Sequence, residues 1–265
     1  MTLASKVALV TGGSSGLGRA IVTALLRADA AVLFTYRTHA DAARALVEEL
    51  SPEGTVASVQ GDVGSEADVA RFVTEAVGRL GRLDILVNNA GIIRDGLALR
   101  MRPEDWAAVI ETDLIGAVRC CRHAVPHLAA GGEGRIINIA SVAGVVGSAG
   151  QANYSAAKAG LIGLTEALAR ELAPQGVTVN AVAPGSIDAG IVAGLPDEAR
   201  RRLLAMIPMG RMGTAAEVAA VVLFLAGSQA GYITGQTIVI DGGVTIPAFS
   251  PTDTVASAGT APTPG

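Results

Sequence analysis

Three residues between positions 141 and 158 have the types and the spacing that a proton-transfer reaction requires. Tyr154 and Lys158 are four positions apart in an alanine-rich run, which predicts a helix from Ser155 onward. Residues at i and i+4 share one helix face, so the ammonium would lie beside the phenol and favour its ionised form. Without such a neighbour a phenol, with a pKa of about 10, is a poor acid-base group at neutral pH.

Ser141 follows the apolar run RIINIA, which predicts a strand, and we expect its hydroxyl at the carboxyl edge of that strand. In an open α/β sheet that edge is where ligands bind. A lone Y-x-x-x-K pair is also common on ordinary helix surfaces, so the chemical interpretation depends on motifs elsewhere in the chain.

A glycine-rich segment, TGGSSGLG at residues 11–18, lies between an apolar run at 6–11 and an amphipathic helix. Strand, glycine turn and helix in this order form the context in which a loop binds the pyrophosphate of a dinucleotide. Gly12 would permit the tight turn, Gly16 would let the backbone approach the pyrophosphate, and Gly18 would let helix and strand pack closely.

The second predicted strand, residues 31–36, should end near the adenosine ribose. Enzymes that prefer NAD commonly have Asp or Glu at that position. Here the residue is Tyr36, followed by Arg37, whose guanidinium suits a 2′-phosphate. The sequence therefore favours NADP, with NAD as the alternative.

Together with TGGSSGLG and the internal NNAG, the YSAAK segment resembles the short-chain dehydrogenase/reductase family. Within that family, DILVNNAGIIRDGLALRM and GQANYSAAKAGLIGLTEALARELAPQGVTVNAVAPG are most similar to bacterial 3-oxoacyl-(acyl-carrier-protein) reductases, and the resemblance runs from Lys6 to about Gly243. It implies reversible hydride transfer between the nicotinamide of NADP and a carbonyl or secondary alcohol. Tyr154 would be the acid-base group, Ser141 would polarise the carbonyl, and Lys158 would hold the nicotinamide ribose.

The resemblance also implies a set of cofactor-binding residues at the glycine loop and at the strand ends. Asp62 and Val63 would meet the adenine. The full set is Gly12, Ser14, Ser15, Gly16, Leu17, Gly18, Arg37, Asp62, Val63, Asn89, Ala90, Gly91, Tyr154, Lys158, Pro184, Gly185 and Ile187.

Several positions differ from the pattern of this family. Asp113, a fourth candidate catalytic residue, replaces an Asn that orients a water in the proton relay, and Ala189 replaces a Thr that contacts the carboxamide. Ser15 stands where many NADP-using relatives have a second basic residue. The segment AAGGEG lacks the Lys or Arg of carrier-protein enzymes, although Arg170 matches a basic docking position.

These differences leave the substrate open. The candidates are a 3-oxoacyl thioester on acyl carrier protein, a free ketone, a polyketide intermediate, a steroid or a sugar. Specificity should lie in loops 92–101 and 142–150 and in the irregular segment 186–209, which we expect to be a mobile lid. A catalytically silent dinucleotide sensor is the alternative outside the enzyme class, but the chain retains both Tyr154 and Lys158.

Alternating strands and helices predict one domain, residues 1–247, with a Rossmann-type, doubly wound parallel sheet of about seven strands. Beyond it, residues 248–265 are rich in Pro, Thr, Ser, Ala and Gly, which predicts a disordered tail. Further strands are expected at residues 55–61, in LDILVNNAG, in VTVNAVAPG and at residues 236–241. Further helices are expected at residues 39–50, after Ser65, from Pro103 toward Leu128, and at residues 215–227.

The charge and composition of the chain argue against some classes of binding partner. The formal charge is −4 and the basic residues are scattered, which argues against nucleic acid and anionic membranes. No signal peptide or membrane-spanning run is evident, so we expect a cytoplasmic protein. The apolar run GLIGLTEALA and the resemblance predict a homotetramer.

The positions of the few Cys and His residues argue against a disulfide framework and against a metal site. Cys120 and Cys121 are adjacent, which suits packing and not a disulfide framework. His123 and His127 lack a third ligand for a metal, so a solvated helix end is expected there and no metal site is predicted. The letters G-x-S-x-G at the glycine loop also spell a hydrolase elbow, but no His follows His127 to complete a triad.

Overall fold

Seven parallel strands lie side by side within the part of the chain that the computed structural model describes, residues 2–189 and 197–246. Their order across the sheet is β3-β2-β1-β4-β5-β6-β7. The predicted doubly wound sheet is therefore confirmed. The strands are β1 (Val7–Val10), β2 (Ala31–Tyr36), β3 (Val56–Gln60), β4 (Ile85–Asn88), β5 (Arg135–Ile139), β6 (Thr178–Pro184) and β7 (Thr237–Ile240).

The strand order reverses at β1, which pairs with β2 on one side and with β4 on the other. Ala8 faces Val32 across the first pair and Ile85 across the second. Connections from the two strands leave in opposite directions, so a crevice opens at their carboxyl ends, the position where doubly wound sheets bind ligands.

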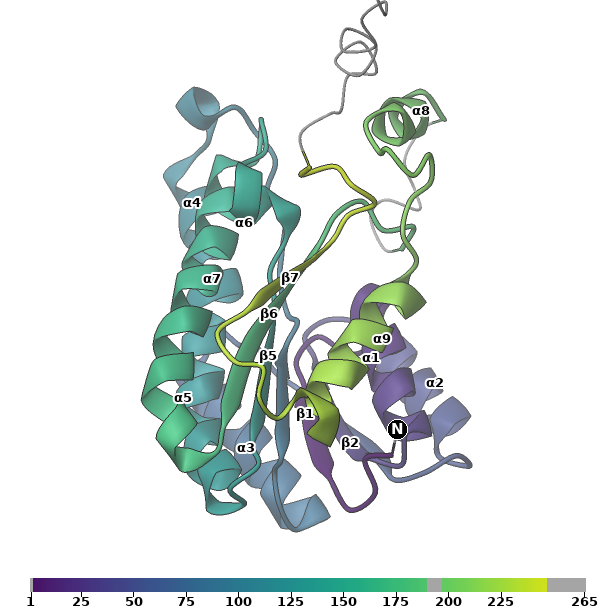
Figure 1. Cartoon of the computed structure of the whole chain (residues 1–265), viewed down its shortest axis with the longest axis vertical. Coiled ribbons are helices and arrows are strands. Elements are labelled where there is room, and N and C mark those ends of the chain that lie inside the picture. Colours follow the sequence, from purple (N-terminus) through teal and green to yellow (C-terminus); the bar gives the residue numbers. More distant parts are fainter. Residues whose placement is uncertain (1, 190–196, 247–265) are drawn as a thin grey trace, which may run out of the picture.

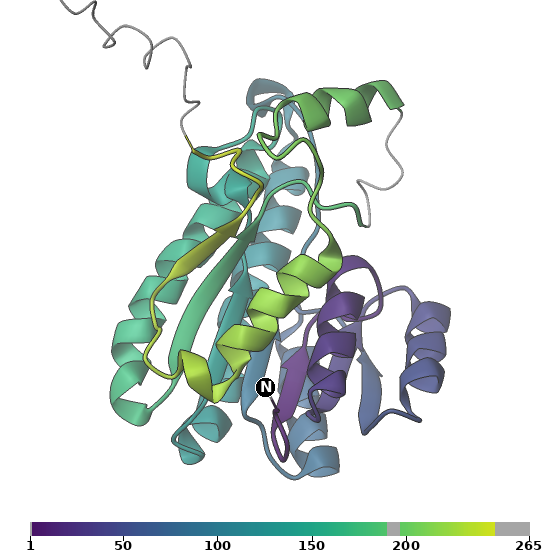
Figure 2. The ribbon, with the colours of Figure 1, turned by 45° about the vertical axis from the view of Figure 1, so that its right-hand side comes forward.

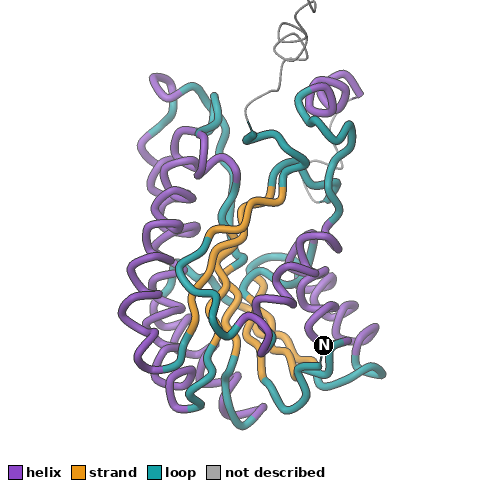
Figure 3. Tube along the Cα trace, viewed as in Figure 1, coloured by secondary structure: helices purple, strands orange, loops and turns teal. Residues whose placement is uncertain are grey.

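Helices cover both faces of the sheet (Figure 1, Figure 3). One layer holds α1 (Gly16–Arg27), α2 (Ala40–Leu50) and α9 (Ala215–Ala226), and the other holds α3 (Glu66–Leu80), α4 (Pro103–Ile110), α5 (Gly116–Ala130) and α7 (Ala152–Leu172). Strands covered on both faces are mostly apolar, and every residue of β1, β4, β5 and β6 is buried. None of the described helices is both long enough and apolar enough to span a bilayer.

The long helix expected from Pro103 to Leu128 contains an irregularity that the sequence did not predict. Residues Glu111–Ile115 form a π-helical segment between α4 and α5. The extra residue in such a segment shifts the phase of the helix, and single π turns of this kind are frequent at functional sites. Here it turns Asp113 inward, where the residue is 1 % exposed.

A second difference concerns the residues after β5. The strand ends at Ile139, and Ser141 is the N-cap of a short helix, α6 (Val142–Val146), that was not predicted. The helix expected from Ser155 begins three residues earlier, at Ala152. Gly144 lets α6 rest directly on α7, since a Cβ there would lie 2.6 Å from the carbonyl carbon of Lys158.

The expected irregular segment 186–209 includes a helix, α8 (Asp197–Ala205), which stands apart from the sheet layers in Figure 2. Charged pairs one turn apart, Glu198 with Arg201 and Arg202, suit a helix whose outer surface is solvated. Residues 190–196 of the proposed lid and the proposed tail at 248–265 lie outside the described residues.

Two expectations concern the Cys and His side chains of α5. Cys120 and Cys121 are free thiols buried in the core, as predicted. His127, in the last turn of α5, is exposed as expected, whereas His123 is half-buried and its Nε2 lies 2.5 Å from Glu66 Oε1, which Arg122 also contacts. A charged partner on a neighbouring helix cannot be seen in the spacing of residues along one helix.

Gly144→Ala should destabilise the fold by about 1–3 kcal/mol, the usual cost of overpacking, because the new methyl would meet backbone atoms of α7. Gly78→Ala is the matched control, since this exposed position within α3 has nothing within 4 Å of an added Cβ. It should be neutral or stabilising by up to about 1 kcal/mol. Urea unfolding of both variants is the measurement, and equal effects would contradict the tight contact between α6 and α7.

Candidate functional site

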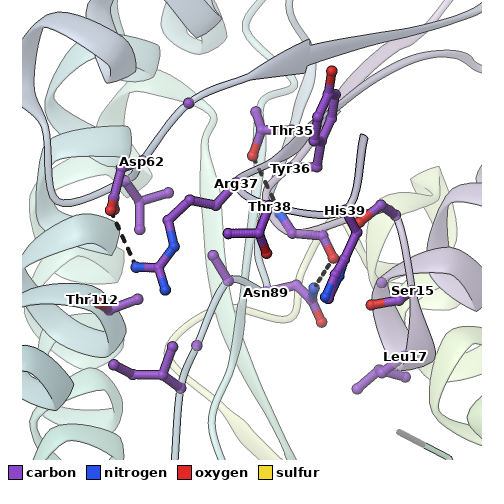
Figure 4. Close-up of a pocket in the computed structure, with 18 of the residues that line it drawn as sticks. Ser15, Leu17, Thr35, Tyr36, Arg37, Thr38, His39, Asp62, Asn89 and Thr112 are labelled. Atoms are coloured by element: carbon purple, nitrogen blue, oxygen red, sulfur yellow. Dashed lines mark hydrogen bonds and ion pairs between the residues drawn. The ribbon is translucent and has the colours of Figure 1, made fainter. Parts of the chain in front are cut away.

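A cavity of about 480 Å³ opens at the carboxyl ends of β1 to β4 (Figure 4). Among the predicted cofactor residues, those that line it are Gly12, Ser14, Ser15, Leu17, Gly18, Arg37, Asp62, Val63, Asn89, Ala90 and Gly91. The lining also includes residues that the sequence analysis did not assign: Gly61, Thr35, Tyr36, Thr38, His39, Ile92, Ile93, Arg94 and Thr112.

Six predicted cofactor residues are outside this lining. Gly16 is the first residue of α1, while Tyr154 and Lys158 lie on α7. Pro184 is the last residue of β6, with Gly185 and Ile187 just after it. These positions continue the carboxyl edge of the sheet toward β6, beyond the cavity itself.

The glycine loop has a backbone that only glycine adopts readily. Gly12 and Gly16 have φ of +67° and +52°, values that strain residues with a Cβ. At Gly18 an added Cβ would lie 2.1 Å from the carbonyl oxygen of Gly12. The three glycines are therefore required by the shape of the turn and by its close contact with α1.

Polar side chains at the carboxyl ends of β1, β2 and β4 hold this turn in place. The Asn89 amide donates to the carbonyls of Thr11 and Gly12 at 2.9 and 3.0 Å, and the Thr11 hydroxyl accepts from the Asn89 and Ala90 N–H groups. From β2, the Thr35 hydroxyl accepts from Gly12 N–H. Thr11 and Thr35 were missed because nothing in their sequence spacing indicates that two strands converge on one loop.

The amino end of α1 suits an anion. Its N-cap, Ser15, makes no side-chain capping bond, and the first turn contains no acidic residue. The first N–H groups of a helix otherwise lack partners and carry partial positive charge. The crowded glycine turn and these free donors together fit a dinucleotide pyrophosphate.

Arg37 and Asp62, predicted to contact different parts of the cofactor, are in contact with each other. Arg37 Nη1 lies 3.2 Å from Asp62 Oδ2 across one end of the cavity (Figure 4). Asp62 is held by its other oxygen, which accepts from Gly64 N–H at 2.8 Å. The long arginine side chain is therefore the partner that is freer to move.

Lys158 is buried with its ammonium group between two oxygen atoms. It is 3 % exposed, and its Nζ donates to the carbonyl of Ile139 at 2.9 Å and lies 3.3 Å from Asp113 Oδ2. Asp113 Oδ2 accepts no hydrogen bond among the described residues, so its attraction to Lys158 is chiefly Coulombic. A buried ammonium needs such partners, because its removal from water is costly.

Asp113 is brought to this position by the π-helical segment and by the loop after β4. Its Oδ1 accepts from Ile92 N–H at 2.8 Å, and a Cβ on Gly91 would lie 2.7 Å from Oδ2. Burial raises the pKa of the Asp113 carboxyl, and the Lys158 charge and the Ile92 N–H oppose that rise. The sequence analysis named Asp113 as a candidate, but its direct pairing with Lys158 was not foreseen.

Tyr154 and Ser141 lie near Lys158 on adjoining elements. The Tyr154 ring centre is 5.4 Å from Lys158 Nζ, on the first turns of α7. Ser141 follows Ile139 by two residues, and its Oγ accepts from Ala143 N–H at 3.1 Å. The side chains of Tyr154 and Ser141 therefore both lie at the carboxyl end of β5, where the Ile139 carbonyl accepts a hydrogen bond from the Lys158 ammonium.

The two loops expected to set specificity adjoin each other. Gly96 N–H donates to the Gly150 carbonyl at 2.8 Å, which joins loop 92–101 to the loop before α7. The buried Asn153 side chain donates to the Arg94 carbonyl at 3.1 Å. Asn153 was missed, since a polar residue in the first turn of a helix has no pattern that marks it as buried.

Comparison with known proteins finds one matching family model, described as enoyl-(acyl carrier protein) reductase, over residues 12–245. The chain is 45 % identical over 241 residues to 3-oxoacyl-(acyl-carrier-protein) reductase FabG of Staphylococcus aureus, covering 91 % of the chain and 98 % of that protein. It is 43 % identical to the proteins of the same name from Staphylococcus epidermidis and Escherichia coli K12. The matches cover 91 % and 92 % of the chain and 99 % of each relative.

Proposed function

The chain belongs to the short-chain dehydrogenase/reductase family of NAD(P)-dependent oxidoreductases, and on this premise we propose that it reduces a ketone to a secondary alcohol with NADPH. The observation that carries the proposal is the buried Lys158 ammonium, held at the carboxyl end of β5 one helical turn after Tyr154. This is the edge of the sheet onto which the glycine-lined cavity also opens.

A nicotinamide dinucleotide, when bound, supplies the hydride. The glycine turn and the uncapped α1 would hold its pyrophosphate, while Asp62, Val63 and the segment after β4 would line its adenosine half. Arg37 would bind the 2′-phosphate that distinguishes NADPH from NADH. Pro184, Gly185 and Ile187 would contact the nicotinamide half.

The proton would come from Tyr154. Its phenol would donate to the carbonyl oxygen of the substrate, and Ser141 would hydrogen-bond the same oxygen and stabilise its developing charge. Lys158 would bind the nicotinamide ribose and keep a positive charge beside the phenol. Asp113 would be a positioning residue that acts on the Tyr154 phenol through Lys158.

The substrate we propose is a 3-oxoacyl thioester carried by acyl carrier protein, because the relatives named above, which match over nearly their whole length, are 3-oxoacyl-(acyl-carrier-protein) reductases. The description of the matching family model, enoyl-(acyl carrier protein) reductase, names a related reaction, the reduction of an enoyl thioester. A panel of 3-oxoacyl and 2-enoyl thioesters, carrier-bound and free, together with free ketones, separates these substrates when NADPH consumption is followed by absorbance. Faster turnover of the enoyl thioester or of a free ketone would overturn the proposed substrate.

Two features of assembly are also proposed. We expect a homotetramer, which light scattering at micromolar concentration would test, and a stable monomer would contradict it. Arg170, exposed near the end of α7, would contribute to docking of the acidic carrier protein.

Tyr154→Phe should lower kcat at least 100-fold, because it removes only the oxygen that carries the proton. Coenzyme dissociation constants should change little. Tyr232→Phe is the control, since Tyr232 is fully exposed, and it should retain wild-type turnover. A Tyr154→Phe enzyme with more than about a tenth of wild-type kcat would remove Tyr154 from the role of proton donor.

Arg37→Ala should reduce the ratio of kcat/KM for NADPH to that for NADH by about tenfold or more, because a charge-assisted bond to the 2′-phosphate is lost. Arg44→Ala is the matched control: it removes an exposed arginine from α2 that contacts Asp41. If the Arg37→Ala ratio equals that of wild type, the phosphate is bound elsewhere.

Asp113→Asn should remain active, and its kcat/KM for alcohol oxidation should rise at lower pH than in wild type. The ionised carboxylate beside Lys158 favours the protonated ammonium and disfavours a negative phenolate nearby, and the amide removes that charge. Glu104→Gln, at an exposed position on α4, controls for a general change in charge. Superimposable wild-type and Asp113→Asn profiles would show that the Asp113 charge does not reach the reacting group.

A further inference from the structure

Asn153 is a fully buried polar residue immediately before Tyr154, and none of the proposed catalytic steps uses it. It lies in the first turn of α7. Its Nδ2 donates to the carbonyls of Arg94 and Asp105 at 3.1 and 3.3 Å, and its Oδ1 accepts from the N–H of Tyr154 at 2.7 Å. One side chain thereby joins the loop after β4, the helix α4 and the start of α7, which lies beside α4 in Figure 1.

The amino end of α7 is not fixed in the usual way. Its N-cap, Gln151, makes no side-chain capping bond, although the first N–H groups of a helix have no partner within the helix. The Asn153 oxygen takes over part of this role by accepting from the N–H of Tyr154. Because its amide group also bonds the two neighbouring segments, Asn153 fixes the first turn of α7 to its surroundings as well as to itself.

The position of Tyr154 depends on this anchor, because little else holds its side chain. Its phenol oxygen makes no hydrogen bond within the part of the chain that the structure describes, and its ring centre lies 5.4 Å from Lys158 Nζ. The backbone of the first turn of α7 therefore sets where the phenol lies. One turn later the helix is fixed again, where Lys158 contacts the Ile139 carbonyl and Asp113.

We infer that Asn153 is a positioning residue for the proton donor. By fixing the start of α7 to the loop after β4 and to α4, it holds the Tyr154 phenol at the distance that proton transfer requires. The inference rests on the proposed role of Tyr154 and adds the residue that keeps its phenol in place. A displacement of about 1 Å at a reacting group can lower a rate about a hundredfold, so a residue remote from the substrate can control turnover.

The test compares Asn153→Ala with Asn180→Ala. Asn180 is the matched control because it is also buried, at 1 % exposure, and its amide donates to the Ile233 carbonyl while its oxygen accepts from Gln236 N–H. It lies in the amino-terminal half of β6, away from the carboxyl edge of the sheet. The values of kcat and KM for a 3-oxoacyl thioester are measured with NADPH in H2O and in D2O. Rates are expressed per coenzyme-binding site, counted by calorimetric titration, so that unfolded protein does not contribute.

Asn153→Ala should lower kcat per site about tenfold to a hundredfold and leave KM and the dissociation constant of NADPH within about twofold of wild type. The ratio of kcat in H2O to kcat in D2O should increase, because transfer of the phenol proton becomes a slower step. Asn180→Ala should keep the wild-type kcat per site and the wild-type ratio. An unchanged kcat or ratio in Asn153→Ala, or an equal loss of kcat in both variants, would overturn the role of Asn153.

A second variant, Asn153→Asp, leaves no cavity and serves if the alanine variant does not fold. It keeps the acceptor for the N–H of Tyr154, but a carboxylate cannot donate to the carbonyls of Arg94 and Asp105. It should lower kcat per site and raise the ratio of kcat in H2O to kcat in D2O. A wild-type kcat per site in Asn153→Asp would contradict the proposed anchoring of α7 to the loop after β4 and to α4.

Failure of this inference differs from failure of the proposed function. If Tyr154→Phe loses turnover while Asn153→Ala and Asn153→Asp keep it, Asn153 is not a positioning residue and the proton-donor role of Tyr154 stands. If Tyr154→Phe itself keeps turnover, or if wild type consumes no NADPH with any thioester or ketone of the panel, the proposed function is wrong, and the inference about Asn153 is wrong with it.

Discussion

The buried ammonium of Lys158 sets the geometry of the whole site. An ammonium that is 3 % exposed is tolerated only where oxygen atoms replace its lost water, and here these come from Ile139 at the end of β5 and from Asp113. Three elements, β5, the π-helical segment and α7, must therefore meet at one point. Gly144 extends this requirement to α6, because only a residue without a side chain lets that helix, and with it Ser141, rest against the backbone around Lys158.

The short segment after β4 connects this ammonium to the cofactor cavity. At one end, Asn89 donates to the carbonyls of Thr11 and Gly12 and so holds the glycine loop. At the other end, Ile92 N–H donates to Asp113. A displacement of this segment would disturb both the loop that we assign to the pyrophosphate and the counter-ion of Lys158. The two parts of the site are consequently built as one unit around four consecutive residues.

Features that depend on local pattern could be predicted from the sequence, and features that depend on contacts between distant segments could not. Apolar runs and glycine turns located the strands and the sheet, and the first helix of the chain follows the glycine loop as expected. The π-helical segment escaped prediction because its extra residue leaves no mark in the letters ETDLI. The pairing of Arg37 with Asp62 joins the ends of two strands, and neither residue's own surroundings in the chain indicate the other.

The place of β1 in the middle of the sheet also constrains how the chain can fold. Its two neighbours are β2, which follows closely in the sequence, and β4, whose Ile85 pairs with Ala8. The parallel pairing of β1 with β4 requires a long loop to close, which slows folding and leaves one edge of each strand exposed to aggregation in the meantime. During synthesis, β1 therefore waits for β4 to emerge before both of its edges are covered.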